Sequence, residues 1–321
     1  MSKMRAVVID STGAPDVLHL AKVPVPGRIS AEFLIKVIAA GVNPIDAKTR
    51  AGKGTSAAIS SYPAVLGCDF SGIVVESAYE AHPLKVGDEV YGMTLAPRFG
   101  GSYAEFLTAP SISLAKKPRS LSHVEAAAVP VAALTAWGAV VDVAKAHEGQ
   151  RILIHAGAGG VGHFAIQFAS FFGAHVTTTA STRNVEWLQE LGAHEVIDYT
   201  ATRFEDVAHD MDVVIDLIGN VQDDTGTRSL SVLKPGGLLV NVPSGSWPTL
   251  MADAAAAGVR ATGYRVPADG ATLTVISRLL ESGDVRVFVD QVFDLDQAPT
   301  AHTSLETGHT RGKIVLKVAD G

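Results

Sequence analysis

Cysteine is nearly absent from this chain of 321 residues, because Cys68 is the only one. A single thiol excludes an intramolecular disulfide and every zinc site that needs two or more thiolates. The N-terminal segment MSKMRAVVID leads directly into an apolar run and lacks the basic, apolar and small-residue order of a signal peptide. We therefore expect a reducing compartment and predict a cytoplasmic protein.

Charged residues are also scarce. They make up 18% of the chain, against a typical value of about 25%, while hydrophobic residues make up 47%. This balance excludes a disordered protein. The 26 Lys and Arg residues and 33 Asp and Glu residues give a net charge of −7. Because no long basic run is present, we expect no nucleic acid and no membrane as partner, and we favour a small-molecule substrate.

The longest stretch without charge, residues 152–182, is not a membrane span. It contains five glycines and three histidines, and these residues interrupt its apolar character. We interpret it as a buried strand, a turn, a helix and a second strand.

The pattern of predicted secondary structure changes near residue 123. Before that point, short β-type runs alternate with Gly and Pro, which is typical of an antiparallel, barrel-like domain. After it, short apolar strands alternate with helices, which predicts a parallel sheet covered on both faces. The sequence thus predicts an α/β protein with a β-rich domain of residues 1–123 and 265–321 and a doubly wound nucleotide-binding domain of residues 124–264.

The strongest motif lies in this second domain. Residues 157–162 form G-x-G-x-x-G between a predicted strand at 151–155 and a predicted helix at 160–172. Gly157 permits the tight turn, Gly159 and Gly160 let backbone N–H groups approach a pyrophosphate, and Gly162 allows close packing of helix and strand, with Val161 between them. The alternative is a turn that serves the fold alone, but strand, spacing and helix together favour a dinucleotide site.

The expected acid of an NAD site is missing. A carboxylate at the end of the second strand usually binds the ribose 2′-hydroxyl, yet here Ala180 is followed by Ser181, Thr182 and Arg183. Hydroxyl groups and an arginine suit a 2′-phosphate, so we predict NADPH as the cofactor. The alternative is that Arg183 is only a solvated residue at a helix start.

Several segments together resemble the medium-chain dehydrogenase/reductase superfamily, specifically its zinc-free quinone oxidoreductase branch, and the resemblance covers nearly the whole chain. The segments are GVNPID (41–46), LGCDFSG (66–72), GDEVYG (87–92), GSYAE (101–105), ALTAW (133–137), HAGAGGVG (155–162) and GHTRGKIV (308–315). The resemblance implies a GroES-like catalytic domain and a Rossmann domain that binds NADP.

Departures from the zinc alcohol dehydrogenases of the same superfamily bear on the chemistry. Those enzymes are expected to place a cysteine ligand where this chain has Asn43 to Asp46, and a His-Glu pair where it has Cys68 and Asp69. Oxidation of an alcohol polarised by zinc is therefore disfavoured, and we predict no metal. We interpret His82, His123 and His302 as ordinary surface or core histidines.

The resemblance also implies where the cofactor lies. It places Asn43 and Thr135 near the nicotinamide and its ribose, and Ser181, Arg183 and Tyr199 around the 2′-phosphate. Residues at later strand ends and in the terminal segment complete the expected lining: Leu217, Gly219, Val242, Ser244 and Lys313. The alternatives are that Tyr199 caps a strand and that Lys313 is a solvated edge residue.

Candidates for catalysis and substrate binding are less specific. Asn43, Asp46 and Lys48 belong to a segment that the resemblance brings to the active site, where Asp46 or Lys48 positions a water or donates to an oxyanion; a structural ion pair is the alternative. An aromatic wall for a flat substrate is drawn from four residues that ordinary packing also explains: Tyr62, Phe99, Trp247 and Tyr264.

We predict an NADPH-dependent, metal-independent reductase that transfers hydride to a quinone or a related conjugated carbonyl. The alternatives are an enone, alkenal or enoyl-thioester reductase, and a protein of low activity that binds NADPH in a structural or binding role. Residues 258–264 read as the last strand of the parallel sheet, whose free edge predicts a homodimer, unless Arg260 guards that edge.

Overall fold

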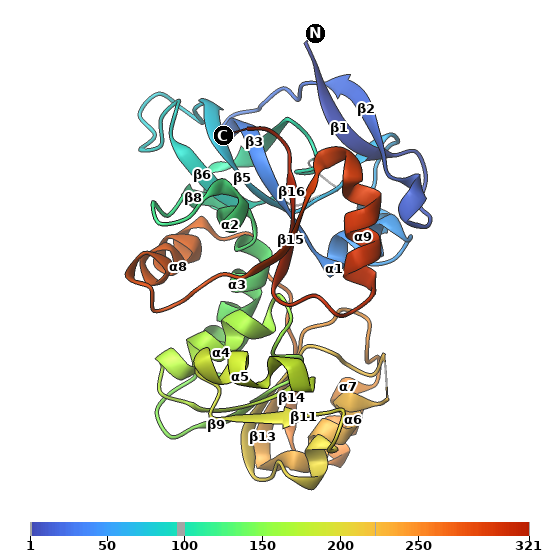
Figure 1. Cartoon of the computed structure of the whole chain (residues 1–321), viewed down its shortest axis with the longest axis vertical. Coiled ribbons are helices and arrows are strands. Elements are labelled where there is room, and N and C mark those ends of the chain that lie inside the picture. The colour runs from blue at the N-terminus through green and yellow to red at the C-terminus, as the bar shows by residue number, and fades with distance from the viewer. Residues whose placement is uncertain (1, 95–99, 222, 321) are drawn as a thin grey trace. The chain divides into compact units, whose positions relative to one another are not determined.

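The structure is a computed structural model that describes residues 2–94, 100–221 and 223–320 (Figure 1). The chain divides into two compact units, one of Met1–Leu134 and Pro267–Gly321 and one of Thr135–Val266. We call them unit 1 and unit 2. The sequence placed the first division at residue 123, before helix α2 (His123–Ala127). That helix packs on unit 1, because Ala127 and Ala128 share a core cluster with Ala39 and Val315.

In the residues that the structure describes, unit 1 is built on two sheets whose strands pair antiparallel, except that β15 pairs parallel with β16. Its larger sheet has seven strands among the described residues, in the order β15-β16-β3-β5-β6-β8 with β7 paired to β3. These strands are β3 (Glu32–Val42), β5 (Asp69–Glu76), β6 (Glu89–Met93), β7 (Phe106–Pro110), β8 (Leu114–Lys116), β15 (Val289–Asp294) and β16 (Lys313–Lys317). A second sheet has the order β2-β1-β4, formed by β1 (Lys3–Ile9), β2 (His19–Pro24) and β4 (Ala64–Val65).

Strand β3 shows how this sheet is covered. It is buried along almost its whole length, because Phe33 and Ile35 enter one hydrophobic cluster while Ala39 enters another. The C-terminal strand β16 pairs antiparallel with β3, so Val315 lies opposite Gly41. The expected return of the terminal strand to the β-rich domain is therefore what the structure shows. The helices of this unit are α1 (Pro44–Arg50), α2, α8 (Gly270–Ser282) and α9 (Ala298–Glu306), and α3 (Pro130–Trp137) crosses the division.

Unit 2 is a parallel six-stranded sheet in the order β11-β10-β9-β12-β13-β14. Its strands are β9 (Arg151–Ile154), β10 (His175–Ala180), β11 (Glu195–Asp198), β12 (Met211–Asp216), β13 (Leu233–Asn241) and β14 (Arg260–Gly263). Its helices are α4 (Gly162–Phe171), α5 (Val185–Glu190), α6 (Thr225–Ser229) and α7 (Leu250–Ala256). The strand order reverses beside β9, which confirms the predicted doubly wound fold.

Two elements differ from the sequence expectations. Residues 298–306 form α9, which we did not predict, although Pro299 in its first turn is a helix-start signal. The alternation of strands and helices in the sequence predicts a helix at 225–233 and a strand at 238–242. In the structure α6 ends at Ser229 and continues as a single 3-10 turn, and β13 begins at Leu233. Within the described ranges, every helix is too short or too polar to cross a bilayer.

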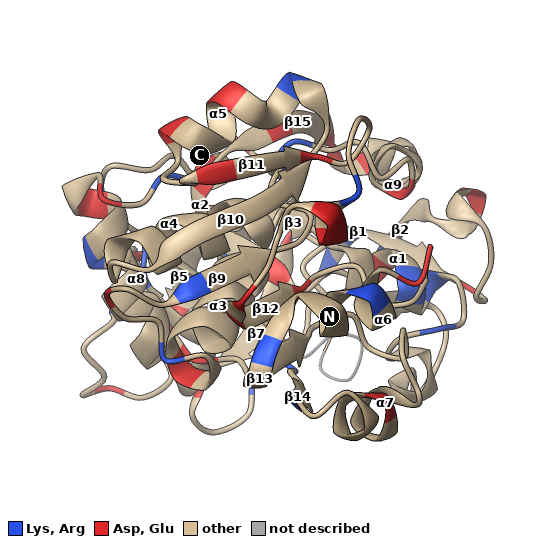
Figure 2. Cartoon of the chain, turned by 90° about the horizontal axis from the view of Figure 1, so that it is seen from below, with Lys and Arg blue, Asp and Glu red and all other residues tan. Residues whose placement is uncertain are grey.

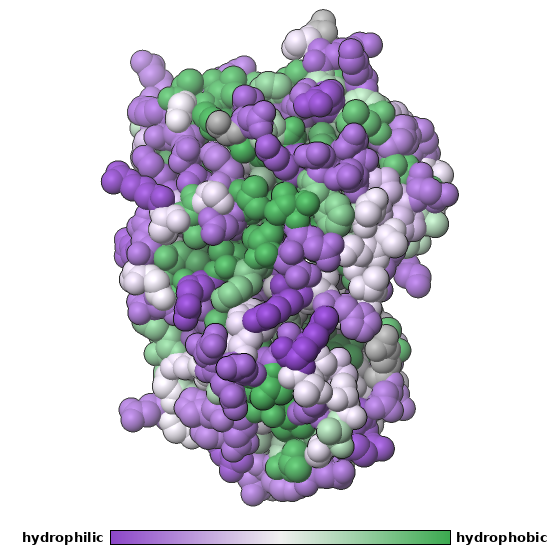
Figure 3. All heavy atoms as spheres, in the orientation of Figure 1, coloured by the Kyte–Doolittle hydropathy of each residue, from purple (hydrophilic) through white to green (hydrophobic). Residues whose placement is uncertain are grey.

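The surface mixes charge and hydropathy. Figure 2 shows positions of Lys and Arg interspersed with positions of Asp and Glu along the ribbon. Figure 3 shows that hydrophobic residues on one face lie in groups among hydrophilic ones.

Candidate active site

The glycine turn between β9 and α4 is packed so tightly that two of its positions require glycine. A Cβ atom on Gly157 would lie 2.2 Å from Thr178 Oγ1, and one on Gly162 would lie 2.3 Å from the Ala156 carbonyl oxygen. Ala156 itself adopts a left-handed conformation with φ 51°. The first and last glycines of the motif therefore lie where the surrounding atoms leave no room for a side chain.

The rest of the turn fits a pyrophosphate. A Cβ on Gly159 would meet only the Ala156 carbonyl oxygen within 4 Å, at 3.3 Å, and residues 158–161 are only partly buried. Helix α4 begins at Gly162, so its N-terminal N–H groups follow directly on this open stretch. An anion of a dinucleotide suits such a helix start, where backbone donors and positive potential coincide.

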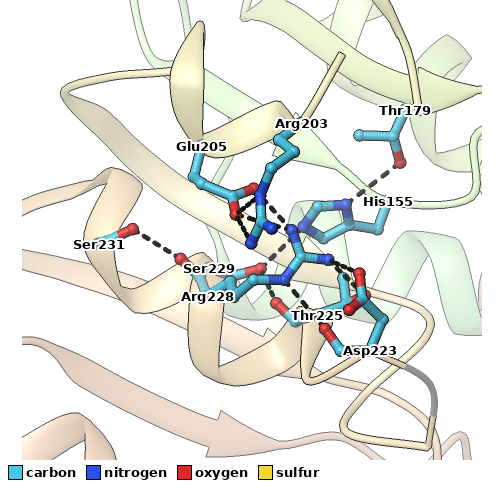
Figure 4. A network of polar contacts seen from close by, with 9 residues as sticks. All are labelled: His155, Thr179, Arg203, Glu205, Asp223, Thr225, Arg228, Ser229 and Ser231. Atoms are coloured by element: carbon cyan, nitrogen blue, oxygen red, sulfur yellow. Dashed lines mark hydrogen bonds and ion pairs between the residues drawn. The ribbon is translucent and has the colours of Figure 1, made fainter. Parts of the chain in front are cut away.

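A buried histidine connects the glycine turn to β10 and α6 (Figure 4). His155 Nδ1 lies 3.2 Å from Thr179 Oγ1 on β10, and His155 Nε2 lies 2.8 Å from Ser229 Oγ on α6. Thr179 Oγ1 also accepts a hydrogen bond from the Ala156 N–H at 3.2 Å. Burial lowers the pKa of His155 to about 4, so the ring is neutral at pH 7 and acts as a fixed connector between three elements.

The same network fixes α6 on its outer side. Arg228 donates to both Glu205 carboxylate oxygens, at 2.9 and 2.6 Å, and to Asp223 Oδ2 at 2.7 Å. Its guanidinium also stacks 4.9 Å from the ring centre of Phe204, whose ring meets His155 edge-on. These contacts hold the segment after β12 against the sheet.

Asp216 organises the carboxyl ends of β12 and β13. Its Oδ1 accepts from the Ile218 and Gly219 N–H groups at 2.9 and 2.7 Å, and its Oδ2 accepts from Asn241 Nδ2 at 2.8 Å. The Val242 N–H donates to the Asp216 carbonyl oxygen at 3.0 Å. Asp216 thus holds together the two loops that carry Leu217, Gly219 and Val242. Ser244 is exposed, and its hydroxyl accepts a hydrogen bond from Arg265.

A carboxylate from the neighbouring strand β11 lies beside the end of β10. Asp198 of β11 pairs in register with Ala180, and its Oδ2 accepts from the Thr182 hydroxyl at 2.5 Å. Its Oδ1 accepts from the Thr200 N–H and hydroxyl at 2.9 and 2.6 Å. The Thr182 and Thr200 hydrogen bonds lower the pKa of Asp198, so it is ionised. Strand β10 itself ends without an acid, as expected from the sequence, and the carboxylate beside it belongs to β11.

Unit 1 contains a second polar centre, which is buried. Lys313 is 3% exposed, and its ammonium donates to the Val42 carbonyl oxygen at 3.1 Å and to Asn43 Oδ1, and lies 3.5 Å from Asp69 Oδ2. Asn43 Nδ2 donates to the same Asp69 oxygen at 2.9 Å, and the Val131 N–H donates to Asp69 Oδ1 at 2.7 Å. Lys313 is therefore no solvated edge residue but the cation of a closed ion pair.

Asp46 adjoins this pair. The Asn43 N–H donates to Asp46 Oδ2 at 2.9 Å, and the Tyr103 hydroxyl donates to it at 3.4 Å. Tyr103 also lies 3.1 Å from Nε2 of His302, which is fully buried. Burial and, after it, the Asp69 charge raise the pKa of Asp46 to about 7. Burial lowers the pKa of His302 to about 3 and raises that of the Cys68 thiol beside Asp46.

Comparisons with known proteins agree on one family. Family models for an alcohol dehydrogenase GroES-like domain and a zinc-binding dehydrogenase match residues 30–119 and 191–316. The 2-methylene-furan-3-one reductase of Solanum lycopersicum is 38% identical over 325 residues, covering 98% of this chain and 79% of that protein. The chain belongs to the medium-chain dehydrogenase/reductase superfamily.

Solved structures place it further within the superfamily. The quinone oxidoreductase of Coxiella burnetii is 39% identical with a TM-score of 0.93, covering 99% of this chain and all of that one. The Escherichia coli quinone oxidoreductase, complexed with NADPH, is 26% identical with a TM-score of 0.88, covering 98% of this chain and all of that one. The chain is thus an NAD(P)H-dependent oxidoreductase of the quinone oxidoreductase branch, as the sequence motifs predicted.

Other residues singled out from the sequence lie in varied surroundings. Lys48 is half-buried on α1, and Thr135 is buried on α3. Arg183 and Tyr199 are exposed, and the Tyr199 N–H donates to the Ala180 carbonyl oxygen; Ser181 is half-buried and accepts from Asn184.

The proposed aromatic wall is not uniform. Trp247 is 6% exposed in the core of unit 2 and donates to Asp253 Oδ2, so packing accounts for it and we withdraw it from the wall. Tyr264 packs so closely on Gly138 that a Cβ there would lie 1.7 Å from its hydroxyl oxygen. Tyr62 is 46% exposed, and Phe99 lies outside the described residues.

This member of the superfamily also has polar residues to which the sequence analysis gave no functional role. Tyr103, His302, Asp198 and Asp216 all act through partners far away in the chain or on another strand. A usable signal for Asp198 is the run EVID at 195–198, which reads as a short strand that ends in an acid.

Proposed function

We propose that the protein is an NADPH-dependent, metal-independent reductase that transfers hydride to a quinone or a related conjugated carbonyl. The observation that carries the metal-independent part is the position of Lys313. Its ammonium is within 3.5 Å of Asp69, next to Cys68, so a fixed positive charge already lies in the segment where zinc relatives are expected to bind their metal. A divalent cation would be repelled there and would have to displace a buried ion pair.

When bound, NADPH supplies the hydride, and the chain supplies position and a proton. The glycine turn and the start of α4 bind the pyrophosphate, while Ser181, Arg183 and Tyr199 bind the 2′-phosphate. An acceptor that gains hydride becomes an anion and needs one proton. Asp46 is the strongest of the candidate donors because burial raises its pKa to about 7, so the carboxyl group is partly protonated near neutral pH.

The placement of Asp46 suits that task. It lies on the first turn of α1, three residues after Asn43, the residue that the family resemblance places at the nicotinamide. Its partners fix the carboxyl group in one orientation: the Asn43 N–H on its own helix and Tyr103 from the segment before β7. Because His302 is neutral, the Tyr103 hydroxyl between them can donate to either neighbour, and Asp46 can keep its proton.

An enone or alkenal acceptor is the second candidate, favoured by the 38% identity to a 2-methylene-furan-3-one reductase. The hydride would go to the β-carbon and the Asp46 proton to the α-carbon or its enolate oxygen. A panel of para-quinones, ortho-quinones, enones and enoyl thioesters, assayed by NADPH oxidation with and without EDTA, tests both. Turnover of no acceptor, despite tight NADPH binding, would instead support a binding role.

We also propose a homodimer through β14, the terminal strand of the parallel sheet. Its outer edge can pair with a second copy across a twofold axis. Arg260 does not block that edge by its contacts, because its Nε donates inward to the Gly236 carbonyl oxygen at 3.0 Å. Light scattering at micromolar concentration tests the dimer, and Ala261→Pro should weaken it by removing a backbone donor.

A further inference from the structure

Asp198 stands out because its charge opposes the phosphate that its neighbours are proposed to bind. It follows Ile197 at the end of β11 and lies beside Ala180 in the parallel register. Its carboxylate reaches Thr182, the residue between Ser181 and Arg183. The three residues proposed to meet a 2′-phosphate are therefore adjacent in the chain to Asp198 or to its hydrogen-bond partner.

The carboxylate is also fully engaged. One oxygen accepts the Thr182 hydroxyl, and the other accepts both the N–H and the hydroxyl of Thr200. Two consequences follow. The threonine hydroxyl protons are directed to Asp198 and not to a ligand, and Asp198 has little capacity left to accept a ribose hydroxyl in the manner of an NAD site.

We propose that Asp198 reduces the preference of this protein for NADPH over NADH. Its negative charge weakens the binding of a 2′-phosphate without replacing that interaction by a bond to an unphosphorylated ribose. The inference rests on the proposed NADPH site, and it assigns to Asp198 an effect opposite to that of Arg183.

The test measures binding of nucleotide fragments and needs no turnover. Adenosine 2′,5′-bisphosphate carries the 2′-phosphate and 5′-AMP lacks it, so calorimetric titration of both separates the phosphate from the adenosine. Asp198→Asn should tighten the bisphosphate about three- to tenfold at roughly 0.1 M ionic strength and leave 5′-AMP unchanged. The gain should shrink at about 1 M salt, where the screening length falls to about 3 Å.

Glu195→Gln is the matched control, because Glu195 is an exposed acid on the same strand. It removes the same charge three residues earlier, roughly 10 Å away along the strand, and should change neither affinity by more than about twofold. Thr182→Val removes a hydrogen bond but leaves the charge, and should not reproduce the gain. Unchanged 5′-AMP binding shows that each variant keeps the adenosine site.

The outcomes separate this inference from the proposed function. If the wild-type protein binds the bisphosphate no better than 5′-AMP, the NADPH assignment fails. Suppose instead that the wild-type protein binds the bisphosphate better than 5′-AMP. The role of Asp198 is then refuted if Asp198→Asn does not raise the affinity for the bisphosphate, or if Glu195→Gln raises it equally.

Discussion

Asp46 in unit 1 and Asp198 in unit 2 are the same chemical group with opposite behaviour. Asp46 is buried, and the loss of water raises its pKa to about 7. Asp198 is partly exposed, and hydroxyl donors from Thr182 and Thr200 lower its pKa. The GroES-like unit thus holds a carboxyl group that keeps its proton near neutral pH, and the Rossmann unit holds one that keeps its charge.

The largest effect should come from breaking the buried centre of unit 1. Lys313→Met leaves Asp69 buried without its cation, and we expect the free energy of unfolding to fall by about 3 to 5 kcal/mol. Chemical denaturation measures it. The matched control is Lys317→Met on the same strand, where the side chain is 47% exposed and its ammonium pairs with Asp320. An equal fall in the free energy of unfolding in both variants would mean that burial of the Lys313–Asp69 pair does not determine its effect on stability.

Asp46→Asn should have the next largest effect. Removing the proton donor lowers kcat by about 100-fold or more, while NADPH affinity stays the same. Because the acid form is the active one, wild-type kcat should fall as pH rises above about 7, and the variant should lose that slope. An unchanged pH profile in Asp46→Asn would assign the proton to another group.

The same variant has a stability signature. The pKa of Asp46 is raised from 3.8, so the folded chain binds this proton more tightly than the unfolded chain. Ionisation then costs stability as pH rises from about 4 through 7. Asp46→Asn, which cannot ionise, should gain stability relative to wild type at pH 8 and show little difference near pH 4. Asp10→Asn, at an exposed position, is the control.

In unit 2, Arg183→Glu should weaken NADPH binding by about 10- to 150-fold and leave NADH nearly unchanged. The reason is the loss of a charge-assisted hydrogen bond to the 2′-phosphate. Arg151→Glu makes the same reversal at the opposite, amino end of the parallel sheet and should affect neither cofactor. Equal loss of NADPH and NADH in Arg183→Glu would contradict the assignment.

Chelation should have the smallest effect. If the Lys313 ammonium is the cation of the buried centre, prolonged EDTA or phenanthroline treatment leaves turnover unchanged. Loss of activity that Zn²⁺ restores would overturn the metal-independent mechanism.

The sequence was most informative where interactions are local. The run from Arg151 to Phe171 combines an apolar strand, a glycine turn and a helix within about twenty residues, and each part signals its neighbours. The doubly wound sheet followed from the repetition of such units. Helix α9 was missed because it is short and follows a strand without a strong apolar period.

The polar centres depended on pairing that a linear motif does not contain. Asp198 reaches the end of β10 only through strand register, eighteen positions after Ala180. Tyr103 reaches Asp46 across 57 positions, and Lys313 reaches Asn43 across 270. The family resemblance singled out Asn43, Asp46 and Lys313, but the hydrogen bonds around them depend on the three-dimensional arrangement.

The pairing of β16 with β3 has a consequence for synthesis on the ribosome. Unit 2 consists of one continuous segment, Thr135–Val266, whereas unit 1 needs residues from before and after it. All the strands of unit 2 are translated before Lys313 exists, so the Rossmann sheet can form while Asp69 still lacks its cation. The nucleotide-binding unit can therefore mature first, and the buried polar centre closes only when translation has passed β16.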